Sequence, residues 1–340
     1  MLFGLFGGAT AKPSSATSDS RLYGDFIDYV CEAEALGFHS VFLVEHHFTG
    51  MAQVSASLGL LTFLAGRTSR IRLGTAVTVL TWHNPVLLAE QAVTLDLVSG
   101  GRLDLGIGRG YRQNEFRGFC IPIEQANERY EEALEVLRKA WASRDRFSHH
   151  GKYWHFDDIV VEPEPTQKPH PPLWIGAGSP AGIRAAAVNG FNLLLDQLAS
   201  FEVTGERVAA FHAAAAAQGR VVKPHSIGLT RALHLTMNER EREEAHRLRA
   251  NFLLSVQALA GGAESSLALP TSFADTRAAS EKAALIGPPD EIVRRLKTLE
   301  AMGVDYVLLL DVSGSREALR TFAREVMPAF AESPSSIPSS

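Results

Sequence analysis

Short apolar runs alternate with longer amphipathic stretches along almost the whole chain, and this alternation predicts an α/β fold. Nearly continuous apolar runs are typical of strands that are covered on both faces. Apolar residues recurring every three or four positions between these runs predict helices. Because a helical pattern follows each run, we expect the strands to be parallel. The expected strands are residues 2–6, 40–44, 71–79, 103–107, 173–175, 191–195, 227–236 and 306–310.

The number of these βα units favours a (β/α)₈ TIM barrel. Such a barrel needs about 250 residues, so two stretches of this longer chain must lie outside the repeat. Residues 144–172 predict an excursion before strand five, and residues 260–280, rich in Gly, Ala, Ser and Thr, predict a mobile loop after strand seven. We expect one domain over residues 1–331 and a disordered tail over 332–340. A doubly wound open sheet with unequal halves is the alternative, but regular units continue to the C-terminus.

Helix boundaries follow from local signals. Asn84 and Pro85 are suited to cap and begin a helix, and Pro180 is suited to begin another after Ser179. Gly37 and the pair Gly100-Gly101 are typical helix stops. The expected helices are residues 22–36, 52–65, 85–98, 127–142, one from 180, one containing 213–217, a charged one after strand seven, 288–302 and 316–330.

Composition narrows the class of protein. Hydrophobic residues make up 46% of the chain and charged residues 21%, as in an ordinary globular protein. A formal net charge of −5 argues against a nucleic-acid or anionic-membrane surface. The two cysteines are too few for a disulfide framework and suit a reducing compartment. With no apolar stretch of membrane-spanning length, we expect a cytoplasmic protein.

The catalytic face of a barrel lies where its strands end, and strand two ends in Glu45-His46-His47-Phe48. Two histidines and a carboxylate there can supply a general base and a group that orients it. If strand geometry persists, Glu45 and His47 share one side and His46 takes the other. The alternative is one histidine in the core and another capping a loop. Adjacent histidines lack the spacing of a helical zinc pair, so we expect no metal.

Two glycine-rich strand ends are candidate anion sites. In Gly106–Gly110 the glycines allow close backbone approach, and Arg109 suits a phosphate or carboxylate. In Gly176–Gly182 Ser179 caps a helix whose exposed N–H groups can bind phosphate. A tight turn with a solvated arginine and a plain helix start are the alternatives.

Small residues also end strand three, where Ala76 and Val77 leave room for a flat ligand. Trp82, His83, Tyr111 and Gln197 are candidates for the walls of a substrate pocket. The histidines of the excursion, His149, His150 and His155, are expected to be solvated.

Together these segments resemble the bacterial luciferase-like family of flavin-dependent monooxygenases. The similarity extends from Phe3 to about Phe330, and the order and spacing of the matching segments are more specific than any one of them. The closest are 43–49, 73–76, 84–86 with 89–90, 95–96 and 101–110.

The resemblance implies a TIM barrel that uses reduced FMN and O₂ to oxygenate a small organic substrate through a flavin peroxide. It implies His46 as the catalytic residue, with Glu45 and His47 shaping its surroundings. Many family members have a non-proline cis peptide at Ala76-Val77. The cofactor-binding residues implied are Glu45, Ala76 and Val77 near the ring, and Arg109, Gly178, Ser179 and Gly182 near the phosphate.

The chain also departs from luciferase. Gly108 stands where the luciferase catalytic chain has a reactive cysteine, and Gly178 and Gly182 replace polar residues of its phosphate pocket, so light emission is not inferred. The resemblance further implies a partner NAD(P)H:flavin reductase and a homodimer. Two alternatives remain open: an oxidoreductase of the same fold that uses the deazaflavin F420, and a non-catalytic flavin-binding subunit.

Overall fold

The computed structural model describes residues 1–9, 18–50, 54–259, 276–311 and 314–331. Three expectations concern residues outside these ranges. They are the start of the second helix near Ala52, most of the mobile loop over 260–280, and the tail over 332–340.

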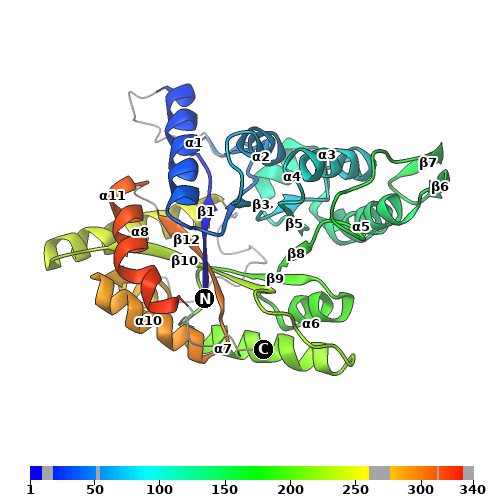
Figure 1. The fold of residues 1–340 in the computed structure, drawn as a ribbon. Coiled ribbons are helices and arrows are strands. Elements are labelled where there is room, and N and C mark those ends of the chain that lie inside the picture. The colour runs from blue at the N-terminus through cyan, green and yellow to red at the C-terminus, as the bar shows by residue number, and fades with distance from the viewer. Residues whose placement is uncertain (10–17, 51–53, 260–275, 312–313, 332–340) are drawn as a thin grey trace, which may run out of the picture.

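Eight parallel strands close into a barrel surrounded by helices (Figure 1). The strand Asn192–Leu195 pairs with the strand Ile227–Leu235, which joins the two ends of the parallel sheet and closes it. The TIM barrel is confirmed, and the open-sheet alternative is wrong. In order around the barrel the strands are β1 (Leu2–Gly7), β2 (Ser40–Leu43), β3 (Arg72–Thr75), β5 (Leu103–Gly108), β8 (Leu173–Gly176), β9 (Asn192–Leu195), β10 (Ile227–Leu235) and β12 (Tyr306–Asp311).

The helices follow the strands as the sequence pattern indicates. Asn84 caps α3 by accepting hydrogen bonds from two backbone N–H groups, and Pro85 begins that helix. The helices are α1 (Asp19–Ala35), α2 (Ser57–Ala65), α3 (Pro85–Val98), α4 (Gln113–Gly118), α5 (Ala126–Ala142), α6 (Pro180–Asn189), α7 (Phe201–Ala216), α8 (Glu239–Leu259), α9 (Thr276–Ala283), α10 (Pro289–Ala301) and α11 (Arg316–Thr321), with shorter turns at η1 (Ile123–Gln125), η4 (Phe322–Val326) and η5 (Met327–Phe330).

Five local features differ from the expectation, and the first is α9, a helix over Thr276–Ala283 that begins inside the stretch 260–280 expected to be a loop. The third strand is not continuous: β3 ends at Thr75, and β4 (Thr78–Val79) follows a cis peptide between Ala76 and Val77. The short helix α4 was not expected. The excursion contains an antiparallel hairpin of β6 (Phe147–His150) and β7 (His155–Ile159). A further strand, β11 (Leu285–Gly287), pairs with the end of β10.

Large side chains fill the interior of the barrel. Phe42, Trp174, Leu194, Tyr306 and Leu308 form a buried cluster inside it, and Phe42 meets Trp174 edge to face at 5.5 Å between ring centroids. Side chains therefore fill the interior of the barrel, and a ligand can bind only at the carboxyl ends of the strands. We call this end of the barrel the mouth.

His149 corrects one expectation about the excursion. Its side chain is buried against α5, with Nε2 3.4 Å from a carboxylate oxygen of Glu132, whereas His150 and His155 are exposed. Among the described residues, no helix is long and apolar enough to cross a membrane, and no three metal-ligating side chains cluster.

Candidate active site

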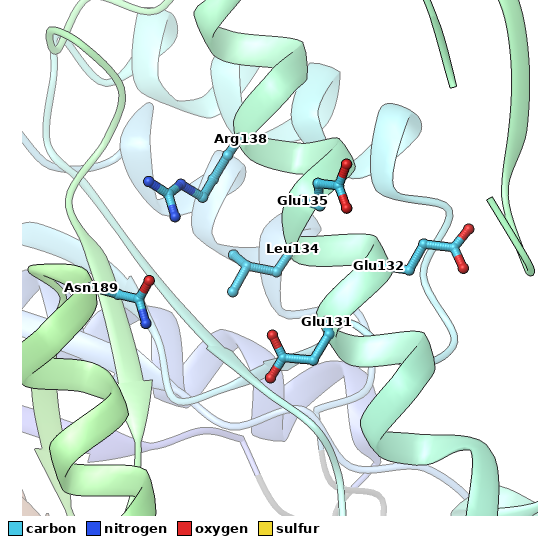
Figure 2. Close-up of a pocket in the computed structure, with 6 residues that line it drawn as sticks. All are labelled: Glu131, Glu132, Leu134, Glu135, Arg138 and Asn189. Carbon is cyan, nitrogen blue, oxygen red and sulfur yellow. The ribbon is translucent and has the colours of Figure 1, made fainter. Parts of the chain in front are cut away.

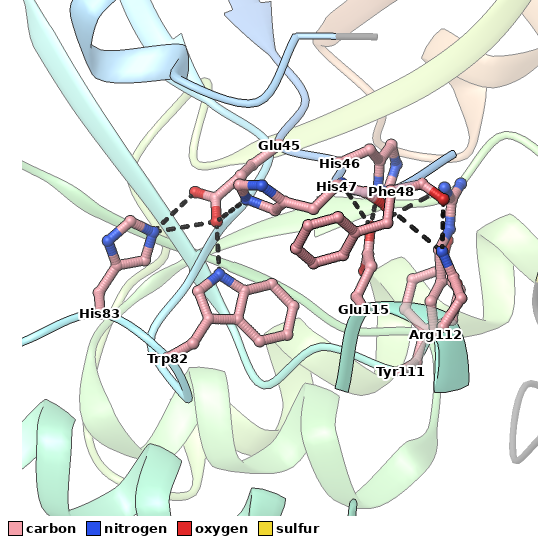
Figure 3. A network of polar contacts seen from close by, with 10 residues as sticks. Glu45, His46, His47, Phe48, Trp82, His83, Tyr111, Arg112 and Glu115 are labelled. Carbon is pink, nitrogen blue, oxygen red and sulfur yellow. Dashed lines mark hydrogen bonds and ion pairs between the residues drawn. The ribbon is translucent and has the colours of Figure 1, made fainter. Parts of the chain in front are cut away.

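The segment after β2 places Glu45 at the centre of a hydrogen-bond network. The residue is only 2% exposed. Oε1 accepts hydrogen bonds from Trp82 Nε1 at 2.8 Å, His83 Nε2 at 2.9 Å and His47 Nε2 at 3.2 Å. Figure 3 shows the carboxylate pointing toward Trp82 and His83, away from His46. Glu45 therefore ties the segment after β2 to the segment between β4 and α3.

These contacts keep Glu45 ionised. Burial by itself would raise the pKa of this carboxyl group, but hydrogen bonds from His47, His83 and Trp82 and the charge of His83 outweigh burial. They lower the pKa from 4.5 to about 2. The negative charge is thus compensated inside the protein rather than by solvent.

His46 points to the other side, as strand alternation predicts, and contacts a second buried carboxylate. Nδ1 of His46 lies 3.1 Å from Oε1 of Glu115, and the same oxygen accepts the backbone N–H of His47 at 3.0 Å. A carboxylate can only accept, so Nδ1 carries the proton in this hydrogen bond. The other ring nitrogen, Nε2, is left with its lone pair when the ring is neutral.

Burial lowers the pKa of His46 below its ordinary value of 6.5. The guanidinium of Arg112 acts in the same direction, whereas Glu115 opposes both. The ring is therefore neutral near pH 7, and Nε2 is a proton acceptor rather than a donor. His46 is suited to be a general base.

Glu115 belongs to α4, which the sequence pattern did not reveal. Six residues are too few to show a helical period, and nothing in the local sequence marks a carboxylate as the partner of a residue 69 positions earlier. The same segment supplies Arg112, 4.0 Å from Glu115, and Asn114, whose amide donates to the carbonyl oxygen of His47 at 3.3 Å. Helix α4 thus fixes the segment after β2 from outside the barrel.

Aromatic rings cover the side of the network that faces α4. Trp82 stacks on Phe119 with ring centroids 4.9 Å apart and meets Phe116 edge to face at 5.6 Å. His47 packs against Phe119 at 4.8 Å. The walls are consequently rigid and apolar beside a polar centre.

Glycines at the ends of β5 and β8 leave room for the side chain of Val77. A Cβ on Gly108 would lie 2.5 Å from a methyl group of Val77, and a Cβ on Gly176 would lie 3.4 Å from the other methyl group. Val77 therefore packs across two glycines, yet it and Ala76 remain partly exposed at the mouth. This surface can accept a flat ring.

Two predicted anion-binding segments lie next to each other at the mouth because β5 pairs with β8. Arg109 is exposed, and its Nη1 donates to the side chain of Asn127 at 2.7 Å, with no carboxylate partner in the described parts of the chain. Ser179 caps α6 by accepting from the N–H of Gly182 at 3.2 Å. The sequence did not reveal Arg207, which lies 2.7 Å from Asp196 and borders Gly178.

The proposed pocket residues divide between two sides of the mouth. Trp82 and His83 are in the Glu45 network, and the hydroxyl of Tyr111 lies 3.4 Å from Nε of Arg112. Gln197 follows β9 instead and accepts a hydrogen bond from Arg249. The structure thus brings Trp82 and His83 together at Glu45, places Tyr111 beside Arg112, and puts Gln197 at the end of β9.

A surface hollow of about 570 Å³ lies between α5 and α6 (Figure 2). Glu131, Glu132 and Glu135 line it with Asn189, the last residue of α6. The end of α6 precedes the start of β9, so this hollow faces away from the mouth. Glu132 is already bound to three backbone N–H groups of residues 152–154.

A barrel with a candidate histidine base, a flat apolar surface and an adjacent candidate anion site is an arrangement that suits a phosphorylated ring cofactor. Comparison with known proteins identifies which class. The family model described as luciferase-like monooxygenase matches residues 1–306, and the chain belongs to that family.

Two curated relatives extend over most of the chain. The oxygenase component of the flavin-dependent trigonelline monooxygenase of Acinetobacter baylyi is 27% identical, covering 95% of this chain and 94% of the relative. The FMNH₂-dependent dimethylsulfone monooxygenase of Pseudomonas putida is 31% identical, covering 79% of this chain and 77% of the relative. The chain is therefore an enzyme of the flavin-dependent monooxygenase class.

Among solved structures, the monooxygenase RslO1 from Streptomyces bottropensis superimposes with a TM-score of 0.86 at 26% identity, over 97% of this chain and all of that one. F420-dependent relatives also match. The F420-dependent glucose-6-phosphate dehydrogenase of Microbacterium testaceum is 33% identical over about half of each protein.

The compensated charge of Glu45 generates a prediction about stability. Because the pKa of Glu45 is lowered in the folded state, the ionised carboxylate stabilises the fold above pH 4.5, its ordinary pKa. This stabilisation is lost as the pH falls toward 2. Glu45→Gln should therefore lower the free energy of unfolding by about 3 kcal/mol at pH 7, and the difference from the wild type should shrink below pH 4.5. Urea unfolding at several pH values measures it.

The exposed Glu317 provides the control, since Glu317→Gln should change stability little at any pH. A Glu45→Gln deficit that stays constant from pH 7 to pH 3 would contradict the account of the Glu45 network.

Proposed function

We propose that this protein is the oxygenase component of a two-component system that uses reduced FMN and O₂ to oxygenate a small organic substrate, with His46 as the catalytic base. The observation that carries the proposal is the pair His46–Glu115, which holds a neutral imidazole after β2, the strand that pairs with β3 just before Ala76 and Val77. The substrate is a small molecule, and an NAD(P)H:flavin reductase supplies the reduced cofactor.

The residues at the mouth fit FMN. Val77, packed across Gly108 and Gly176, supports one face of the ring. Arg109, exposed and without a carboxylate partner in the described chain, binds the phosphate together with Ser179 and the turn through Gly178 and Gly182. When bound, reduced FMN supplies the electrons that activate O₂.

The protein residues hold and move protons. Nε2 of His46 accepts a proton during the reaction, and Glu115 stabilises the imidazolium that results. Glu45 is enclosed by its three donors, so it contributes to the cofactor site by orienting His47, Trp82 and His83. The aromatic rings of Trp82 and Phe119 exclude water on that side.

Cofactor choice is the most direct test of the function. Reduced FMN and reduced F420 are titrated separately into the anaerobic protein, and each complex is then mixed with O₂. We expect tighter binding of FMN and oxygen-dependent absorbance changes in more than one phase. Preference for F420 without any reaction with O₂ would make the chain an F420-dependent oxidoreductase. Binding of FMN without turnover in any substrate screen would make it a non-catalytic subunit.

The His46–Glu115 pair predicts two different mutant phenotypes. His46→Asn should reduce turnover of a substrate found by screening by about 10²–10⁴-fold, with little effect on FMN affinity. Glu115→Gln should reduce turnover less and should shift the acidic limb of the pH–rate profile to lower pH, because Glu115 raises the pKa of His46. An unchanged profile in Glu115→Gln, or full turnover in His46→Asn, would contradict these roles.

The phosphate assignment is tested by comparing FMN with riboflavin, which lacks the phosphate. Arg109→Ala should weaken FMN binding at least about tenfold, the effect of one hydrogen bond to a charged group, and leave riboflavin affinity unchanged. Arg146→Ala, a change at an exposed arginine of the excursion, is the matched control. Equal losses for both flavins would show that Arg109 does not act on the phosphate.

We also propose a homodimer formed through α2 and α3, which lie side by side at one edge of the barrel (Figure 1). Large apolar side chains are exposed there, including Phe63 at 51% and Val98 at 58%. Large exposed apolar side chains on two neighbouring helices are a feature of subunit interfaces.

The homodimer makes a prediction about mass in solution. Light scattering of the wild type should give twice the mass of one chain. The double substitution Phe63→Glu and Val98→Glu should give the monomer, because a dimer would bury two unpaired charges on each subunit. Val221→Glu, at a position that is 93% exposed, should leave the dimer intact. A monomeric wild type, or a dimeric double variant, would overturn the proposed interface.

A further inference from the structure

Arg249 is a buried cation that has no anionic partner among the described residues. The residue is 1% exposed and lies on α8, and burial lowers its pKa to about 10, so the guanidinium remains charged at neutral pH. Its hydrogen-bond acceptors are the side-chain and backbone oxygens of Gln197, and its Nε has none. No carboxylate forms an ion pair with it in the described ranges of the chain. Buried charges in proteins are normally paired.

Other arginines of the barrel show what a structural role requires. Each nitrogen of Arg102 donates to an oxygen of residues 65–71 or of Ser99, so that guanidinium is fully satisfied. Arg72 binds both oxygens of Asp104, at 2.6 and 2.9 Å. Buried Arg231 also lacks an acceptor for its Nε, but its other nitrogens donate to four oxygens. Among the described residues Arg249 donates only to Gln197, so its guanidinium is open to a further partner.

Strand β10 carries a second buried polar group without a hydrogen-bond partner, on the side that faces the interior of the barrel. A Cβ on Gly228 would contact Leu194 and Leu308 inside the barrel, so the even-numbered residues of β10 face the interior. His234 is one of them, near the end of the strand; it is 8% exposed, and its Nε2 has no partner. Burial first, then Arg249 and His246, lower the pKa of His234 to about 4, so the ring is neutral near pH 7.

Arg249 lies on the face of helix α8 that packs against the side of β10 that carries the even-numbered residues. Ala245 packs with Ala232 and Ile286, and Arg249 follows Ala245 by four residues, on the same face of the helix. Gln197 lies two residues beyond the end of β9. Arg249, His234 and Gln197 therefore converge where β9 and β10 reach the mouth. In the closed order of strands, β9 is directly across the barrel from β2, which carries His46.

We propose that Arg249, with His234 and Gln197, binds the carboxylate of the organic substrate. This inference rests on the proposed function and adds the substrate class, a small organic acid. The guanidinium Nε and the imidazole Nε2 bind the carboxylate oxygens, and the rest of the molecule extends across the mouth toward His46. The phosphate of the cofactor lies between these two sides, at the ends of β5 and β8, so the two anions occupy separate sites.

The test uses flavin-free protein and simple probes. Acetate, benzoate and phenylacetate are titrated calorimetrically, beside acetamide, benzamide and phenylacetamide. We expect at least one carboxylate to bind saturably and its amide to bind at least about tenfold more weakly, since hydrogen bonds to charged groups are the stronger ones. Arg249→Met should weaken carboxylate binding by a similar factor, and Arg249→Lys should restore part of it.

Arg247→Met is the matched control, because Arg247 lies on the same helix but is exposed and paired with Glu244. Arg249→Met should also keep or raise the melting temperature, since it removes an unpaired buried charge, whereas a purely structural arginine would be needed for folding. Failure of all three carboxylates to bind, equal binding of acids and amides, or unchanged binding in Arg249→Met would each overturn the proposal.

These outcomes are independent of the proposed oxygenase reaction. Carboxylate binding is measured without flavin, and the reaction of the reduced-FMN complex with O₂ is measured without substrate. Arg249→Met should leave FMN affinity unchanged. A loss of FMN affinity equal to that of Arg109→Ala would assign Arg249 to the cofactor and overturn the substrate site.

Discussion

The segment after β2 is held between two buried carboxylates, and the candidate active site depends on this arrangement. Glu45 fixes one side through His47, Trp82 and His83, while Glu115 fixes the other through the ring of His46 and the backbone of His47. Alternation of side chains at a strand end makes the division possible, because consecutive residues point to opposite sides. Two adjacent histidines consequently have different surroundings and different roles.

This arrangement also explains why the mouth can be both rigid and reactive. The charge of Glu45 is compensated by donors within the protein, whereas burial keeps His46 neutral. Next to this polar centre, Val77 packs across glycines to give a flat surface, and the neighbouring ends of β5 and β8 hold the proposed anion site. The proposed base, ring surface and anion site thus lie at the ends of neighbouring strands of the barrel. The strands across the barrel, β9 and β10, remain available for substrate.

The sequence predicts the barrel well because alternating apolar runs and helical periods directly report burial on strands and helices. It also predicts the opposite orientations of Glu45 and His46, since alternation is a local property of the backbone. It does not predict Glu115 or Arg249, whose partners are distant in sequence. Helix α4 is too short to show a period, and β11 has only three residues. Burial of His149 depends on packing against α5, which no local pattern encodes.

The protonation state of His46 tests the central claim most directly. Nitrogen-15 NMR of histidine-labelled protein, with His46→Asn for assignment, distinguishes the two neutral tautomers and the imidazolium. The account predicts a neutral ring at pH 7 with the proton on Nδ1, donated to Glu115, and Nε2 unprotonated. A ring protonated on Nε2 alone, or one that is charged at pH 7, would contradict His46 as the base oriented by Glu115.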